Sequence, residues 1–142
     1  MGHDYIQYEG HHERFSDLDL WTLRHFFIEK ARTMEAARPS HDSTQLREFF
    51  EEWEWLGPGV FTGTDFSRYV ADTRTRWELL VQLLQRSGDR ISGSGEFVPL
   101  DYLSAHVSTR AAYFTKEQPT RPYLVCIGRI CTLLSKHAPQ AG

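Results

Sequence analysis

The chain has 142 residues, and its 16 lysine and arginine residues against 19 aspartate and glutamate residues give a formal net charge of −3. This length fits one domain. Hydrophobic residues make up 40% of the chain and aromatic residues 13%, which is enough apolar surface for a packed core and argues against global disorder. The same composition excludes collagen-like, coiled-coil and disulfide-scaffold proteins.

The N-terminal residues lack a basic start followed by an apolar stretch, so no secretory signal is expected. The most apolar run, residues 123–134, is interrupted by Gly128 and Arg129 and is too short to span a membrane. Cys126 and Cys131 are five residues apart and would point to different faces of one helix. We therefore expect two reduced, buried thiols rather than a disulfide, as is typical of a cytoplasmic protein.

Residues 1–15 are polar and rich in histidine, and Gly10 interrupts any regular element among them. We interpret them as an N-terminal arm, either extended or holding a short strand over residues 5–8. The remaining residues, 16–142, are expected to form a single helical domain.

Two helices are predicted in the first half of this domain. The sequence Ser-Asp-Leu-Asp at 16–19 is typical of a capping box, and the apolar spacing after it predicts a helix to about Ala37. A second helix is expected after Asp42, and the Gly-Pro-Gly at 57–59 ends it. Its inward side chains at helical spacing are Leu46, Phe49, Phe50 and Trp53.

The longest apolar periodicity of the chain lies in a third predicted helix. It begins at Phe66, behind a second capping-box pattern at 62–65, and ends at the Ser-Gly-Asp of 87–89. Residues 91–95 contain two glycines and two serines and are expected to form a flexible loop.

The C-terminal part leaves more alternatives. Pro99 fits the first turn of a short helix through Leu103, and residues 107–114 either extend it or form a strand. A last helix is expected over 122–137, with a strand at 124–127 as the alternative. The predicted fold class is mainly α, an irregular bundle of four to five helices, with a short strand pair in the N-terminal or C-terminal half left open.

Charge is segregated along the chain. Residues 1–63 hold 12 acidic and 6 basic side chains, net −6, whereas residues 64–142 hold 7 acidic and 10 basic side chains, net +3. The acidic part peaks at the end of the second predicted helix, with the carboxylates Glu48, Glu51, Glu52 and Glu54 beside the indoles Trp53 and Trp55.

The two indoles cannot both face one core. Trp55 lies about 200° round a helix from Trp53, so one is exposed unless the helix is sandwiched. Aromatic side chains dominate interface hot spots, and surrounding carboxylates speed encounter with a basic surface. These six residues therefore predict a docking face for a basic protein, with an ordinary solvated helix face as the alternative.

In its small size, acidity, aromatic content and lack of a catalytic signature, the chain resembles bacterial immunity proteins, which neutralise cognate toxins. The resemblance implies a tight one-to-one complex in which acidic groups cover the active site of a toxin that acts on a negatively charged substrate. In this sequence Glu48, Glu51, Glu52 and Glu54 would form that surface, with Trp53 or Trp55 as its anchor.

Two other classes are kept as alternatives. One is a small enzyme whose site is assembled from the scattered residues His25, Asp101, Tyr102 and His106. The other is a self-associating helical domain that forms a homodimer through Trp55 and Leu56.

Cofactor, metal and nucleic-acid binding find little support. His3, His11 and His12 have metal-ligand chemistry, but their spacing matches no helical site, so no metal is expected. The glycine-rich stretch 88–95 lacks the Gly-Lys-Ser/Thr of a phosphate loop, so no cofactor is expected. A pI of about 6.1 argues against nucleic acid. Arg129, in the last apolar segment, is expected either on the solvent side or paired with Asp19 or Glu78.

Overall fold

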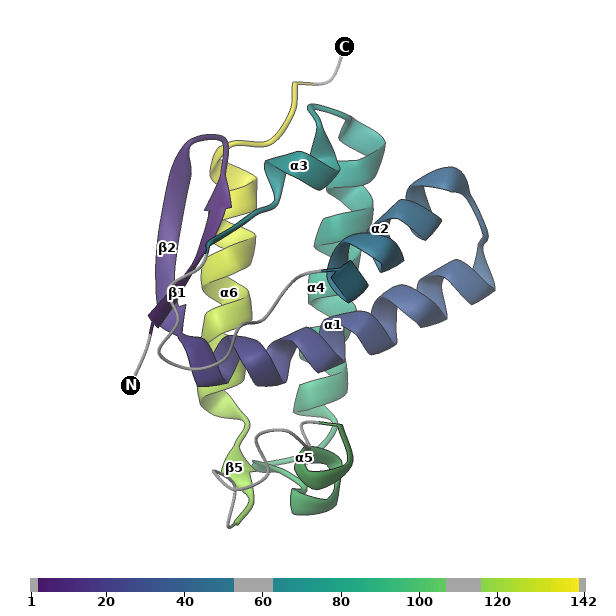
Figure 1. Cartoon of the computed structure of the whole chain (residues 1–142). Helices are drawn as coiled ribbons and strands as arrows, with labels where there is room; N and C mark the ends of the chain where they lie inside the picture. The colour runs from purple at the N-terminus through teal and green to yellow at the C-terminus, as the bar shows by residue number, and fades with distance from the viewer. Residues whose placement is uncertain (1–2, 53–62, 107–115, 141–142) are drawn as a thin grey trace.

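The computed structural model describes residues 3–52, 63–106 and 116–140. These residues form six helices and five short strands, which confirms a mainly α fold (Figure 1). The elements in chain order are β1 His3–Tyr8, β2 His11–Ser16, α1 Asp17–Ala37, α2 His41–Glu52, β3 Gly63–Asp65, α3 Ser67–Val70, α4 Arg74–Ser92, β4 Phe97–Val98, α5 Leu100–His106, β5 Gln118–Pro119 and α6 Arg121–Lys136.

The residues predicted to be an N-terminal arm form a β-hairpin. β1 and β2 pair antiparallel through a turn at Glu9 and Gly10, whose φ angles are 48° and 78°. Positive φ at both central residues is typical of a tight hairpin turn. β1 also pairs in parallel with β3, so the sheet order is β2-β1-β3.

The hairpin belongs to the core. Ile6 and Tyr8 are fully buried, and Phe15 is almost so. Alternate residues of a strand point to one face, which is why Ile6 and Tyr8 enter the core together while Gln7 stays exposed.

Three long helices supply most of the remaining core. α4 and α6 lie side by side, and α1 crosses them (Figure 1). Their facing side chains are buried at the spacing of a helical stripe; fully buried members include Leu23, Phe27, Leu80, Leu84, Ile130 and Leu134. α6 is helical throughout, so the alternative of a strand at 124–127 is wrong.

The third predicted helix is interrupted in the structure. β3 and the single turn α3 precede it, and Ala71 and Asp72 adopt left-handed φ angles of 47° and 57° before α4 begins at Arg74. A left-handed residue cannot continue a right-handed helix. The apolar spacing of 66–84 therefore belongs to two helices that bury their apolar residues in the same core.

The predicted end of that helix at residues 87–89 is also wrong, because α4 continues through Gly88 to Ser92. A Cβ added at Gly88 would lie 3.9 Å from Cγ2 of Ile127 on α6, in ordinary van der Waals contact. A residue of low helix propensity thus lies inside α4, on the side that packs against α6. Ile91, expected in a flexible loop, is fully buried.

The helix starts differ from the predicted caps. Ser16 flanks α1 but makes no side-chain capping bond. α2 starts at His41 rather than after Asp42. Its cap is reciprocal: the Ser40 hydroxyl accepts the Ser43 amide at 3.0 Å, and the Ser43 hydroxyl accepts the Ser40 amide at 2.9 Å. This pair satisfies two amides that the helix itself leaves unbonded.

Arg129 takes a partner that the sequence did not indicate. Its guanidinium donates to Oε2 of Glu13 at 2.7 Å and to the Arg14 carbonyl at 2.8 Å, and it lies 4.4 Å from the Phe15 ring centre. The side chain is exposed, as the solvent-side alternative predicts, and it joins α6 to β2, the outer strand of the hairpin. Across the described segments, no helix is long and apolar enough to cross a bilayer.

Both cysteines are free thiols on α6, as expected, but only Cys126 is buried; Cys131 is half-buried. Burial raises the pKa of Cys126 to about 11, and burial also raises the pKa of Cys131. The thiolate is the reactive form. We therefore expect Cys126 of the native protein to react with a thiol reagent at pH 8 about 100-fold more slowly than an ordinary cysteine.

A colorimetric thiol assay with and without denaturant measures this difference. Both thiols should react rapidly once the chain is unfolded. Rapid reaction of both thiols in the native protein would show that α6 is not packed as described.

Candidate binding site

Three of the six residues predicted to form a docking face lie on the last two turns of α2. Glu48 and Glu51 are half-buried and Glu52 is exposed, while Leu46 and Phe50 of the same helix enter the core. Trp53, Glu54 and Trp55 lie outside the described residues, so their part of the prediction stays a prediction.

Arginines accompany the described carboxylates. Arg47 donates from Nε to Oε1 of Glu35 on α1 at 2.7 Å, and from Nη1 to Oε2 of Glu51 at 3.3 Å. Its Nη2 lies 3.8 Å from Oε1 of Glu48. One guanidinium thus holds three carboxylates, a network that we call the Arg47 cluster.

Two arginines of the neighbouring helix α1 also bind Glu51. Arg32 donates from Nε to Oε1 of the carboxylate at 3.1 Å, and Arg24 donates from Nη2 to the backbone carbonyl at 3.0 Å. Burial lowers the pKa of Arg24, while the Glu51 carboxylate raises it. Bonds to Thr44 and Arg47 hold the pKa of Glu35 below its ordinary value, so this carboxylate stays ionised.

The Arg47 cluster changes the electrostatics that the sequence suggests. Glu35, Glu48 and Glu51 face Arg24, Arg32 and Arg47, so these six charges balance. Glu52 is the exposed carboxylate of this end of α2, and among the described residues it makes no ion pair. Steering of a basic partner would therefore depend on Glu52 more than on Glu48 or Glu51.

Part of the cluster was readable from the sequence. Arg47 and Glu51 are four residues apart, the spacing of neighbours on one helix face. The contacts of Arg32 and Glu35 depend on how α1 packs against α2, which no local pattern states.

The residues considered for an enzymatic site lie in different surroundings. Tyr102 is buried with its ring stacked on Phe26 at 4.4 Å, and burial raises its pKa well above the ordinary value. Asp101 is exposed at the start of α5, and His25 lies on α1 with its ring 6.0 Å from that of Trp21. His106 ends α5, and its side chain lies outside the described part.

The N-terminal histidines make ring contacts. His11 stacks on His137 with the ring centres 3.9 Å apart, and His12 meets the ring of Tyr5 edge-on at 5.2 Å. Within the described segments, no group of three or more histidine, cysteine, aspartate or glutamate side chains has the geometry to hold a metal ion.

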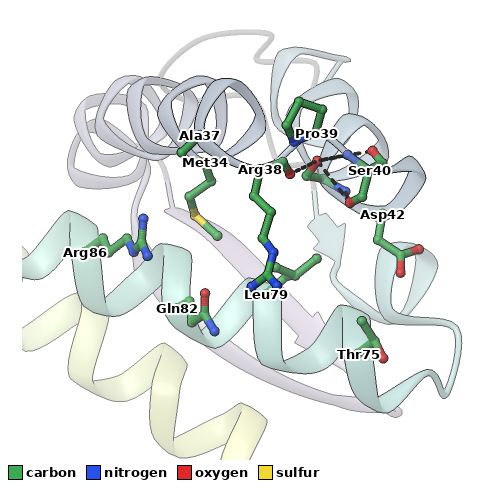
Figure 2. Close-up of a pocket in the computed structure, with 11 residues that line it drawn as sticks. Met34, Ala37, Arg38, Pro39, Ser40, Asp42, Thr75, Leu79, Gln82 and Arg86 are labelled. Atoms are coloured by element: carbon green, nitrogen blue, oxygen red, sulfur yellow. Dashed lines mark hydrogen bonds between the residues drawn. The ribbon is translucent and has the colours of Figure 1, made fainter.

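A hollow of about 400 Å³ lies at the other end of α2. The end of α1, the connection 38–40 and the first turn of α2 form one wall, and α4 forms the other (Figure 2). Met34 and Leu79 are its apolar side chains from the two long helices. Arg38 reaches from the end of α1 toward α4, whereas Arg86 rises from α4 toward α1 (Figure 2).

The acidic group of this hollow is already bound. Asp42 accepts a bond from Nε of Arg76 at 2.8 Å, and Arg76 also donates to the Tyr69 carbonyl at 3.1 Å. Arg38 and Arg86 make no ion pair or side-chain hydrogen bond with any described residue. The two arginines are remote in sequence, and only the crossing of α1 and α4 brings them to one hollow, so no local pattern marks either one.

No protein-family model, curated protein or solved structure matches this chain. A function therefore has to be inferred from the chain's own residues.

Proposed function

We propose that this protein is a cytoplasmic, non-catalytic binding protein that docks on a partner protein through the C-terminal end of α2 and the residues that follow it. The partner class that we propose is a toxin whose active site accepts a negatively charged substrate. The observation that supports this is the orientation of α2: Leu46 and Phe50 enter the core, whereas the Glu52 carboxylate at the end of the helix is exposed.

The contacts of α2 refine how such a surface would work. Arg32 and Arg47 bind the Glu51 carboxylate, so a partner's lysine or arginine would have to compete with both. Glu52 needs no such exchange and would meet a basic partner first. Trp53 or Trp55 would then supply the apolar anchor of the interface.

Charge reversal at Glu52 tests this surface. We expect Glu52→Lys to slow association with the partner by roughly threefold to tenfold at low salt, because a like charge now opposes encounter, and to lose this effect at high salt. The partner is first identified by low-salt capture from native lysate and intact mass measurement. Association rates and inhibition of the partner's activity are then measured with purified components.

Asp89→Lys is the matched control, since Asp89 is also an exposed helical carboxylate with no ion pair among the described residues. It makes the same charge change on α4 and should leave association unchanged. Equal rates for Glu52→Lys, Asp89→Lys and the unmodified chain would contradict the proposed surface. Glu51→Lys is a poor probe, because it would place an ammonium among three guanidiniums and disturb the fold.

A further inference from the structure

We propose that the hollow between the end of α1, the start of α2 and α4 binds a phosphate monoester that carries a small apolar group, with Arg38 and Arg86 as its charge partners. This site lies at the opposite end of α2 from the proposed docking surface. It uses none of the residues of that surface and does not depend on it.

The hollow is positively charged. Arg38 and Arg86 supply two positive charges that no described carboxylate neutralises, and the carboxylate of Asp42 is taken by Arg76 at 2.8 Å. Arg86 and Asp42 lie toward opposite ends of the hollow (Figure 2). Both arginine side chains are exposed, and with Asp42 paired to Arg76 the hollow carries a net charge of about +2.

Both cations of the hollow are guanidinium groups, which are well suited to binding phosphate. A guanidinium is planar, remains charged at any pH that a folded protein tolerates, and offers five N–H donors that match the oxygens of phosphate. A phosphate monoester bears a charge of about −1.5 to −2 at pH 7. Two arginines that enter from opposite walls match this dianion better than they match a monoanion.

The volume of the hollow and its apolar side chains indicate a ligand larger than phosphate alone. A volume of about 400 Å³ lies within the range of small-molecule pockets and exceeds what a bare phosphate fills. Met34 of α1 and Leu79 of α4 both line the hollow, and Met34 is almost fully buried whereas Leu79 is half-buried. An apolar group on the phosphate would cover the accessible part of Leu79, while the amide of Gln82 remains available to the phosphate oxygens.

Phenyl phosphate is the probe that tests this site, with binding followed by NMR titration of the full chain at pH 7.5. We expect saturable binding, with shifts confined to residues of the hollow. Arg38→Met and Arg86→Met should each weaken binding by about tenfold or more, because each removes charged hydrogen bonds. Methionine keeps an unbranched side chain in place of the aliphatic part of arginine, and circular dichroism checks that each variant is folded.

Arg121→Met is the matched control, since Arg121 is exposed at the start of α6 and makes no ion pair with a described residue. It should bind phenyl phosphate as the unmodified chain does. Lack of saturation up to about 10 mM, or equal affinity of the Arg38, Arg86 and Arg121 variants, would overturn the proposal.

Two further probes and a change of pH test the ligand class. Phenyl sulfate has the same shape with one charge fewer and should bind about tenfold more weakly than phenyl phosphate; equal affinity would overturn the assignment of a dianion. Inorganic phosphate lacks the apolar group and should also bind more weakly; equal affinity would overturn the apolar contact. Lowering the pH from 7.5 to 5 should weaken phenyl phosphate but not phenyl sulfate, because the second pKa of a phosphate monoester is near 6.

A phosphotyrosine side chain of another protein presents the same group as phenyl phosphate. A short phosphotyrosine peptide therefore serves as the last probe. If the peptide binds more tightly than phenyl phosphate and Arg86→Met abolishes this binding, the result supports the site and identifies its ligand as a phosphotyrosine of another protein. If phenyl phosphate binds as tightly as the peptide or more tightly, the result supports the site and identifies its ligand as a free organic phosphate.

Discussion

Replacing Phe50 with alanine should destabilise the protein by about 3–5 kcal/mol, the usual cost of removing a buried phenyl ring from a close-packed core. Phe50 is fully buried on α2, and its ring centre lies 5.4 Å from that of Phe27 on α1 and 5.9 Å from that of Phe66. The ring thus joins α2 to α1 and to the residues that lead into α3. The free energy of unfolding of a single domain is only about 5–15 kcal/mol, so this substitution would remove a large part of it.

Phe97→Ala is the control for this substitution. Phe97 is 45% exposed on the two-residue strand β4, so the same deletion there should cost less than about 1 kcal/mol. Urea unfolding followed by circular dichroism measures both variants. A similar loss for Phe50→Ala and Phe97→Ala would show that α2 is not anchored in the core as described.

Replacing Arg76 with methionine should cost about 2 kcal/mol, the second largest effect that we expect. Its guanidinium binds Asp42 on α2 at 2.8 Å and the Tyr69 carbonyl on α3 at 3.1 Å, and it lies 5.2 Å from the Tyr69 ring centre. Tyr69 in turn donates its hydroxyl to the Asp42 carbonyl at 2.8 Å. Removing the Arg76 guanidinium leaves the partly buried Asp42 carboxylate without its ion pair. It also removes the contacts by which this side chain of α4 binds α2 and α3.

Arg74→Met provides the comparison on the same helix. Arg74 is 45% exposed; it pairs with Glu78 at 3.3 Å, donates to the Pro139 carbonyl at 3.0 Å and lies 4.5 Å from the Trp77 ring centre. Exposed ion pairs of this kind contribute about 0.3–0.5 kcal/mol. Because the side chain is exposed, water replaces most of these contacts when it is removed, and the loss should stay below about 1 kcal/mol. Denaturant unfolding should therefore separate the two variants clearly, and equal losses would contradict the role given to Arg76 in joining α2, α3 and α4.

The sequence by itself determined where most helices form. The apolar spacing before Ala37 marks α1, and the run after Pro122 marks α6, because helical periodicity is a property of neighbouring residues. It also indicated the mainly α class and two free thiols. These features depend on contacts within a few turns of chain, so they can be read without knowing how the helices pack.

The tertiary structure decided the features that depend on remote contacts. β3 gains its strand only by pairing with β1, and the left-handed residues Ala71 and Asp72 divide what the apolar spacing predicts as one helix. Gly88 is helical although glycine has a low helix propensity, and it lies against Ile127 of α6. No local pattern contains these pairings, since the partners are far apart along the chain.

The same division holds for the charged sites. The acidity at the end of α2 was visible in the sequence, and so was the spacing of Arg47 and Glu51. The packing of α1 against α2 decided that Arg32 offsets this acidity, and the crossing of α1 and α4 brought Arg38 and Arg86 to one hollow. Charge content is a property of the sequence, but whether a charge is paired or available depends on which helices meet.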